Sequence, residues 1–193
     1  MAIGLRVCTH PRVAPLTLAG YSFAMALFRR ALDLLGIEST SGSVRVGDVA
    51  PDFTLQDSEG NAVNLKAALA GGPVLLAFFP AAFTSGCTQE LRTYGGRYDQ
   101  LIERGAKLFA ISTDRPETLD RFRTSLRADF AFLSDAEGKV SRLYAGLLAG
   151  KSKRVTVTID SDGKVARLTS GARAIFPGGD ISACPIRKEA AQG

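Results

Sequence analysis

An uninterrupted apolar run in the middle of the chain, PVLLAFF at residues 73–79, restricts the fold more than any other feature. A short run without polar alternation is typical of a strand that is buried on both faces. A second run of this kind, AKLFAIST, follows at 106–113, and helical patterns occupy 88–105 and 114–126. Because buried strands that alternate with helices need helices on both faces of a sheet, the sequence predicts an α/β sandwich.

Two hairpins are predicted to add antiparallel strands to this sheet. Residues 50–65, APDFTLQDSEGNAVNL, predict two short strands around a turn at 58–61. Residues 153–169 contain two alternating segments joined by an Asp162-Gly163 turn, which is a strong hairpin signal. We therefore expect a central mixed β-sheet flanked by helices.

The two longer helical segments contain residues that mark their limits. Gly95 and Gly96 predict a kink within the helix of 88–105. Asp114 is expected to cap the next helix, with Pro116 in its first turn.

Both ends of the chain differ from the central part, which we take to be a domain of residues 44–170. Residues 1–43 form an extension in which the uncharged stretch 13–28 resembles the core of a signal peptide. An amphipathic helix pattern begins at Met25, so we hypothesise that Met25 is the true start of the protein. Residues 171–193 lack helical periodicity of useful length, so we expect an atypical tail in place of a last helix.

Composition excludes several kinds of site. The single histidine, His10, lies in the extension, and the three cysteines, Cys8, Cys87 and Cys184, are far apart. We therefore expect no zinc site, no other metal or cofactor, and no thiol activated by a histidine inside the domain. The absence of a disulfide pattern favours a cytoplasmic protein, although residues 13–28 leave membrane association or export open.

Charge and motifs also limit the partners. The net charge of +5 comes from scattered bases, which is typical of an ordinary solvated surface and gives no support to nucleic-acid binding. No glycine-rich nucleotide-binding motif is present. The apolar stretch 13–28 is too short for a stable membrane span.

The segment that carries chemistry is FFPAAFTSGCTQEL, residues 78–91, where a buried strand leads through a loop to Cys87 at a helix start. Unpaired backbone N–H groups at a helix N-terminus favour an anion, so a thiol there loses its proton more readily. A lone cysteine is often only a buried apolar side chain. The polar and flexible neighbours of Cys87 do not fit a core side chain, so position alone leaves both a reactive thiol and a structural cysteine open.

Three positions together carry a family resemblance. The pattern Pro80-x-x-x-Thr84-x-x-Cys87 after LLAFF resembles the peroxidatic motif of the peroxiredoxins, which are thiol peroxidases of the alkyl hydroperoxide reductase and thiol-specific antioxidant family. AISTDRPETLDRF and FLSDAEGKV resemble its bacterioferritin-comigratory, or Q-type, branch, and the resemblance covers roughly residues 44–169. It implies a thioredoxin-like fold with extra N-terminal strands.

The resemblance also implies a reaction and the residues that perform it. Cys87 would attack a hydroperoxide and become a sulfenic acid. Thr84 would offer its hydroxyl to the thiolate and the peroxide, and Pro80 would shield the pocket. Arg154, in RVTVTID, would stabilise the thiolate and the peroxide oxygens. The substrates would be hydrogen peroxide and small alkyl hydroperoxides.

Each supporting residue also has a plainer interpretation. Thr84 can be an ordinary helix cap, and Pro80 can simply end the strand. The role of Arg154 can instead belong to Lys151 or Lys153, which are its neighbours in sequence. Glu90 lies three residues after Cys87. It matches a glutamate that is frequent in the family, and the plainer interpretation is an acid in the first turn of the helix.

The chain departs from the Q-type branch at the resolving position. That branch often has a second cysteine five residues after the first, where this chain has Arg92. Cys184 and Cys8 remain as candidate resolving cysteines, and we expect a one-cysteine mechanism that is completed by an external thiol. Thioredoxin, glutaredoxin or a low-molecular-weight thiol would be the reductant, for a monomer or homodimer. The alternative function is a non-catalytic thioredoxin-like redox sensor or interaction domain.

Overall fold

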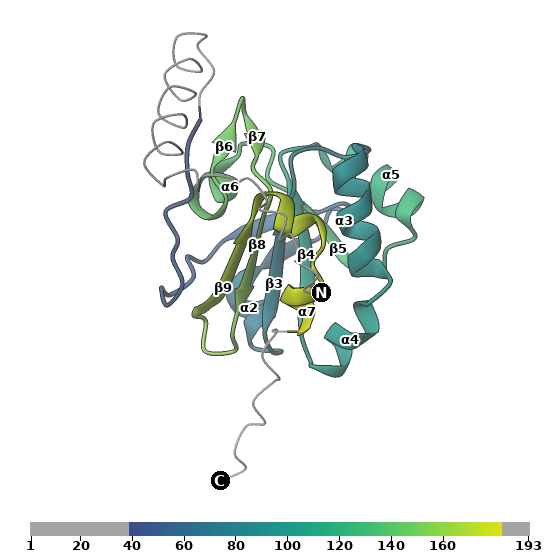
Figure 1. Ribbon diagram of the computed structural model, residues 1–193. Helices are drawn as coiled ribbons and strands as arrows, with labels where there is room; N and C mark the ends of the chain where they lie inside the picture. The colour runs from purple at the N-terminus through teal and green to yellow at the C-terminus, as the bar shows by residue number, and fades with distance from the viewer. Residues whose placement is uncertain (1–38, 183–193) are drawn as a thin grey trace, which may run out of the picture. The chain divides into compact units, whose positions relative to one another are not determined.

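The computed structural model describes residues 39–182, which are coloured in Figure 1. The interpretations of Cys8, His10, Met25, the stretch 13–28 and Cys184 lie outside the described residues.

A seven-stranded mixed sheet forms the centre of the described chain, with the strand order β2-β1-β5-β4-β3-β8-β9. β3, β4 and β5 are mutually parallel, whereas β8 and β9 at one side and β1 and β2 at the other pair antiparallel. The strands are β1 (Thr54–Asp57), β2 (Ala62–Asn64), β3 (Val74–Phe78), β4 (Lys107–Ser112), β5 (Ala131–Ser134), β8 (Val155–Ile159) and β9 (Val165–Ser170), with β6 (Leu147–Leu148) and β7 (Lys151–Ser152) as a separate hairpin.

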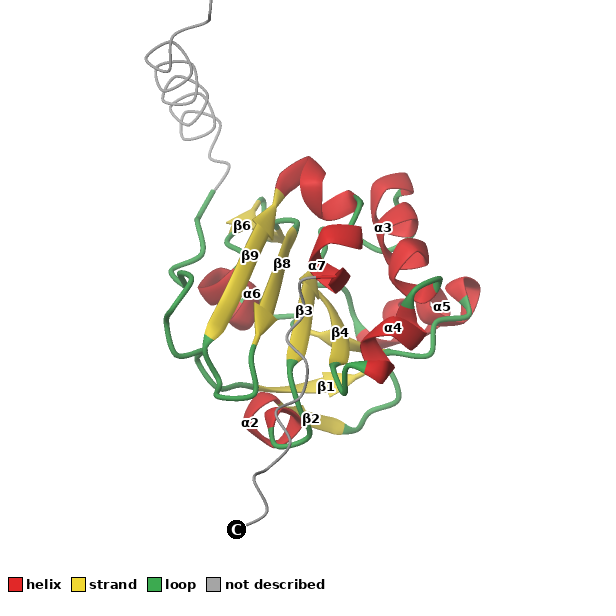
Figure 2. Cartoon of the chain, turned by 60° about the horizontal axis from the view of Figure 1, so that its bottom comes forward, coloured by secondary structure: helices red, strands yellow, loops and turns green. Residues whose placement is uncertain are grey.

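Helices cover both faces of this sheet (Figure 2). α3, α4, α5 and α7 pack on one face, and α2 and α6 pack on the other. The helices are α2 (Leu65–Leu69), α3 (Ser85–Gly95), α4 (Tyr98–Glu103), α5 (Pro116–Leu126), α6 (Lys139–Tyr144), the 3-10 helix η1 (Gly171–Ile175) and α7 (Gly178–Ser182). This arrangement confirms the predicted mixed sheet flanked by helices.

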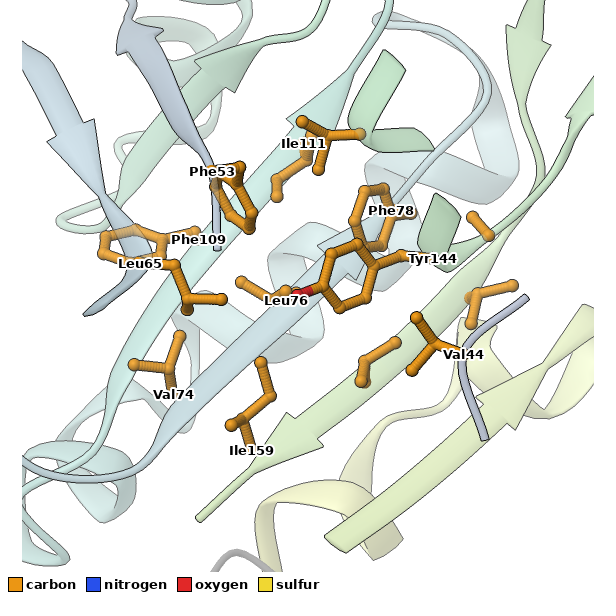
Figure 3. Close-up of a cluster of buried hydrophobic side chains, with 14 of the residues drawn as sticks. Val44, Phe53, Leu65, Val74, Leu76, Phe78, Phe109, Ile111, Tyr144 and Ile159 are labelled. Atoms are coloured by element: carbon orange, nitrogen blue, oxygen red, sulfur yellow. The ribbon is translucent and has the colours of Figure 1, made fainter. Parts of the chain in front are cut away.

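The apolar run that ends at Phe79 explains why the sheet needs two helical layers. Leu76 and Phe78 of β3 point into the cluster in Figure 3, where the Phe78 and Tyr144 rings stack with centroids 5.7 Å apart. Leu75 and Phe79 point to the opposite side, into the cluster that also contains Cys87. Alternate side chains of one strand are thus buried in two separate cores.

Two details of the helices differ from the sequence-based expectations. The predicted kink at Gly95-Gly96 is a break, because α3 ends at Gly95 and α4 begins at Tyr98. Asp114 does not cap α5, whose N-cap is Arg115 without a side-chain cap bond. The physical reason is that the Asp114 carboxylate is engaged by other donors, which include the backbone N–H of Ala82.

The described part of the atypical tail that we expected contains two short helical segments. Residues 171–175 form η1, and residues 178–182 form α7. The side chains of Ala174 and Ile181 are fully buried. These turns are too short to produce a periodic sequence pattern, so only their packing on the sheet reveals them.

Candidate active site

The loop between β3 and α3 sets the position of Cys87. Pro80, which lacks a backbone N–H, lies two residues after the end of β3 and is half-buried. Phe83 has a left-handed backbone with φ of 61°, which turns the chain sharply before the helix. Thr84 is the extended N-cap residue, so Cys87 lies in the first turn of α3. Its side chain is completely buried.

Strand pairing brings Arg154 to this first turn. Phe78 pairs with Val155 in the antiparallel register of β3 and β8, so the preceding residue, Arg154, lies at the end of β3 where the loop begins. Its Nη2 donates to Cys87 Sγ at 3.1 Å, and its Nη1 donates to the carbonyl oxygen of Gly86 at 3.4 Å. A Cβ at position 86 would stand 3.1 Å from Arg154 Nη2, so glycine allows the guanidinium to approach this closely.

Glu90 binds the other side of the same guanidinium. Arg154 Nη1 donates to Glu90 Oε2, and the Glu90 side chain is fully buried. Burial raises the pKa of Glu90 to about 8, against the opposing attraction of Arg154. Its other oxygen, Oε1, has no hydrogen-bond partner among the described residues, which a neutral acid tolerates better than a carboxylate.

The two lysines near Arg154 in sequence are engaged elsewhere. Lys151 Nζ lies 2.9 Å from Asp114 Oδ1, and Lys153 Nζ donates to Thr40 O at 2.6 Å. Arg154, by contrast, donates directly to the sulfur of Cys87. The geometry therefore favours Arg154 over Lys151 and Lys153 as the cation of the site.

Thr84 lies close in sequence but bonds locally. Its hydroxyl donates to the carbonyl oxygen of Ala81 at 3.1 Å, and the residue is exposed. Thr84 occupies the N-cap position of α3, as the helix-cap interpretation expects. Its hydroxyl, however, makes no cap hydrogen bond to the helix. The hydroxyl thus forms a hydrogen bond within the loop that leads to Cys87, on the solvent-facing side of that loop.

Two features of the site have no clear signal in the sequence. Ile175 of η1 lies over the first turn of α3, 3.9 Å from where a Cβ of Gly86 would be. The Asp114 carboxylate, just after β4, accepts a hydrogen bond from the backbone N–H of Ala82 in the active-site loop. Each contact joins segments more than 30 residues apart, which local patterns do not reveal.

Cys87 is the one cysteine among the residues that the structure describes, and it is not in a disulfide. Arg92, at the position of the Q-type resolving cysteine, is an exposed residue of α3. Within the described range 39–182, no helix has the length and apolar character that crossing a membrane requires.

Comparisons with known proteins identify the family of this chain. The sequence profile described as "AhpC/TSA family" matches residues 46–168. Peroxiredoxin Bcp of Escherichia coli K12 is 36% identical over 131 residues, which are 63% of this chain and 83% of that protein. The crystal structure of peroxidoxin BcpB from Mycobacterium tuberculosis is 35% identical, has a TM-score of 0.66, and is matched over 71% of this chain and 92% of that chain.

A more distant structure supports the fold alone. The bacterioferritin comigratory protein of Xanthomonas campestris is 21% identical, with a TM-score of 0.65, over 74% of this chain and 96% of that chain. Together, the similarities confirm the thioredoxin-like fold and the Q-type resemblance, and they do not favour the sensor alternative. The chain therefore belongs to the AhpC/TSA family and is a peroxiredoxin, an enzyme that reduces peroxides with a thiol.

Proposed function

We propose that Cys87 is the peroxidatic cysteine and that Arg154 activates it. The observation that carries this proposal is the 3.1 Å contact between Arg154 Nη2 and Cys87 Sγ in a buried site. A guanidinium so close to sulfur stabilises the thiolate, which is the nucleophile. No histidine is needed for this activation.

The reaction follows from these two residues. The Cys87 thiolate attacks one oxygen of the hydroperoxide, an S–O bond forms and the O–O bond breaks. The sulfur is oxidised by two electrons to a sulfenic acid, and the leaving oxygen takes a proton to give water or an alcohol. Arg154 donates hydrogen bonds where negative charge moves between sulfur and the two oxygens.

Thr84 and Pro80 complete the proposed site. Thr84 is exposed at the loop, so a small rotation of its hydroxyl away from Ala81 would let it bond an entering peroxide. Pro80 is half-buried at the start of the same loop and would limit access by water. The substrates are hydrogen peroxide and small alkyl hydroperoxides; alkyl peroxide reduction is an activity of the Xanthomonas campestris bacterioferritin comigratory protein.

The sulfenic acid is resolved by an external thiol. Arg92 occupies the position where a cysteine on the same helix would form the local disulfide. Cys184 is the candidate for an internal alternative. Thioredoxin, glutaredoxin or a low-molecular-weight thiol then returns Cys87 to the thiol, in a cytoplasmic monomer or homodimer.

The test follows the intact mass of the reduced protein after a slight excess of hydrogen peroxide is added without reductant. We expect rapid gain of one oxygen, and loss of that product in Cys87→Ser. Cys184→Ser separates the two routes, because a disulfide that disappears in this variant would make Cys184 the resolving cysteine. Oxidation of Cys87 no faster than that of free cysteine would reject the proposed function.

Arg154→Met tests the activating cation. Removing one donor of this kind lowers a rate by about 10²–10³-fold in other enzymes. Arg92→Met is the matched control, since it removes an exposed arginine from the same helix that holds Cys87. Equal rates for the two variants would show that Arg154 does not activate the thiol.

A further inference from the structure

Asp114 follows the carboxyl end of β4, in the middle of the sheet, and its carboxylate binds the backbone of the active-site loop. Its side chain is only 11% exposed. Its own N–H donates to Ser112 Oγ at 3.2 Å, and its carbonyl oxygen accepts from Ser134 Oγ at 2.8 Å. Two strands therefore fix the base of this side chain.

The carboxylate reaches the loop that carries Cys87. Asp114 Oδ2 accepts from the backbone N–H of Ala82 at 2.7 Å, in the middle of the β3–α3 connection. The next residue is Phe83, whose left-handed backbone is unusual for a bulky side chain and persists only when its surroundings hold it. The bond to Ala82 and the contact of the Phe83 ring with Phe122, at a centroid distance of 4.9 Å, provide this hold.

The same carboxylate reaches the segment that carries Arg154. Asp114 Oδ1 lies 2.9 Å from Lys151 Nζ in β7, three residues before Arg154. Lys151 is half-exposed, so this ion pair is the weaker of the two connections. One side chain thus bonds both segments that must meet for the guanidinium to reach the sulfur.

We propose that Asp114 is a positioning residue of the peroxidase reaction, which holds the loop of Cys87 and the segment of Arg154 in register through Ala82 and Lys151. It acts through other residues and does not touch the reacting atoms. This inference rests on the proposed roles of Cys87 and Arg154. Displacement of a reacting group by about 1 Å can cost about 10²-fold in rate, so even a small shift is measurable.

The test measures the second-order rate constant of Cys87 oxidation by hydrogen peroxide at a fixed pH, in variants of the full chain. We expect a fall of about 50-fold in Asp114→Ala. Asp114→Asn keeps an oxygen that can accept from Ala82, so its loss is smaller. In Lys151→Met the rate constant falls by about fivefold, as expected for the loss of a half-exposed ion pair, and Lys151→Arg restores it.

A double-mutant cycle distinguishes positioning from general destabilisation. If Lys151 acts through Asp114, adding Lys151→Met to Asp114→Ala causes no further loss. The matched control is Asp135→Ala, because this buried carboxylate at the end of β5 binds the N–H groups of Val140 and Ser141 at the start of α6. It is expected to destabilise the fold without changing the oxidation rate of the folded protein.

The outcomes separate this inference from the proposed function. Asp114→Ala and Asp114→Asn that stay folded and react within twofold of the wild type would overturn the inference, while the fast wild-type oxidation of Cys87 still stands. The inference would also be overturned if the double variant lost rate by the product of the two single losses, because the two residues would then act independently. If Asp114→Ala does not fold, the Asp114→Asn and Lys151 variants decide the question by the same criteria.

Discussion

Glu90 and Cys87 accept hydrogen bonds from the same guanidinium, that of Arg154. The pKa of Glu90 is raised by burial to about 8, so at neutral pH the acid is mostly protonated and leaves the guanidinium charge for the thiolate. Above about pH 8 the ionised Glu90 competes with Cys87 for the same cation. We expect the peroxide rate constant of Glu90→Gln, divided by that of the wild type, to rise from near one at about pH 6.5 to about five at about pH 9.

The ratio is the useful quantity, because pH effects that are common to the two proteins cancel in it. Stopped-flow measurements from about pH 6 to about pH 9.5 provide it, with Glu59→Gln as an exposed control. A Glu90→Gln protein that is slower by the same factor at every pH would contradict this prediction, because the effect of Glu90 would not follow its ionisation.

The same residue links stability to pH. The carboxyl of Glu90 has a pKa of about 8 in the folded protein and an ordinary value of 4.5. Between these values the folded state binds one proton more than the unfolded state, so the free energy of unfolding falls as pH rises, by up to about 1.4 kcal/mol per pH unit. Urea unfolding at pH 5, 6, 7 and 8 should show a shallower fall in Glu90→Gln, and identical slopes would contradict the raised pKa.

At the scale of elements, α7 is held on the sheet by one buried acid. Asp180 Oδ1 accepts from Arg167 Nε at 2.8 Å and from Thr169 Oγ1 at 2.6 Å, both on β9. Ile181, the next residue, is buried in the core cluster that includes Cys87. We expect Asp180→Ala to lower the free energy of unfolding by about 1–3 kcal/mol, since the acid is buried and Arg167 is half-exposed.

Loosening α7 should also uncover the thiol. Local opening of an element raises the exposure of the groups beneath it before global unfolding does. Alkylation of Cys87 by iodoacetamide under native conditions is therefore expected to be several times faster in Asp180→Ala. Glu59→Ala, which breaks the exposed pair with Arg123, serves as the control. If Asp180→Ala is destabilised but its Cys87 is alkylated at the wild-type rate, opening of α7 does not expose the thiol.

The elements that the sequence predicts well are those with a strong local pattern. β3, β4 and the β8–β9 hairpin follow directly from apolar runs and the Asp162-Gly163 turn. β6 and β7, with two residues each, have no such pattern and exist through their pairing with each other. The break between α3 and α4 is stronger than the predicted kink, because Gly95 and Gly96 end the helix.

The whole molecule explains which site residues the sequence can identify. Cys87, Thr84 and Pro80 belong to one short motif, so the resemblance locates them together. Arg154 is 67 residues away from Cys87, and only its place in the family pattern identifies it. The sequence predicts Asp114 as a helix cap and misses its contact with Ala82, which depends on how β3 and β4 lie in the sheet. Long-range pairing thus completes a site of which the motif supplies one part.

The last twelve described residues test how much of the chain the site requires. Residues 171–182 bury Ala174 and Ile181 and cover the first turn of α3, whereas residues 183–193 contain Cys184. A chain that ends at Ser182 should keep the wild-type peroxide rate constant and still form a sulfenic acid. A chain that ends at Ser170 should lose at least about 3 kcal/mol of unfolding free energy through the loss of these buried side chains.

Urea unfolding and stopped-flow oxidation of both truncated proteins check this prediction. The first protein also tests external resolution, because reduction of its sulfenic acid by an added thiol cannot involve Cys184. Turnover that disappears with residues 183–193, while Cys87 still oxidises at the wild-type rate, would show that this segment takes part in resolution. A chain ending at Ser170 that remains as stable and as reactive as the full protein would mean that η1 and α7 only rest on a site that is complete without them.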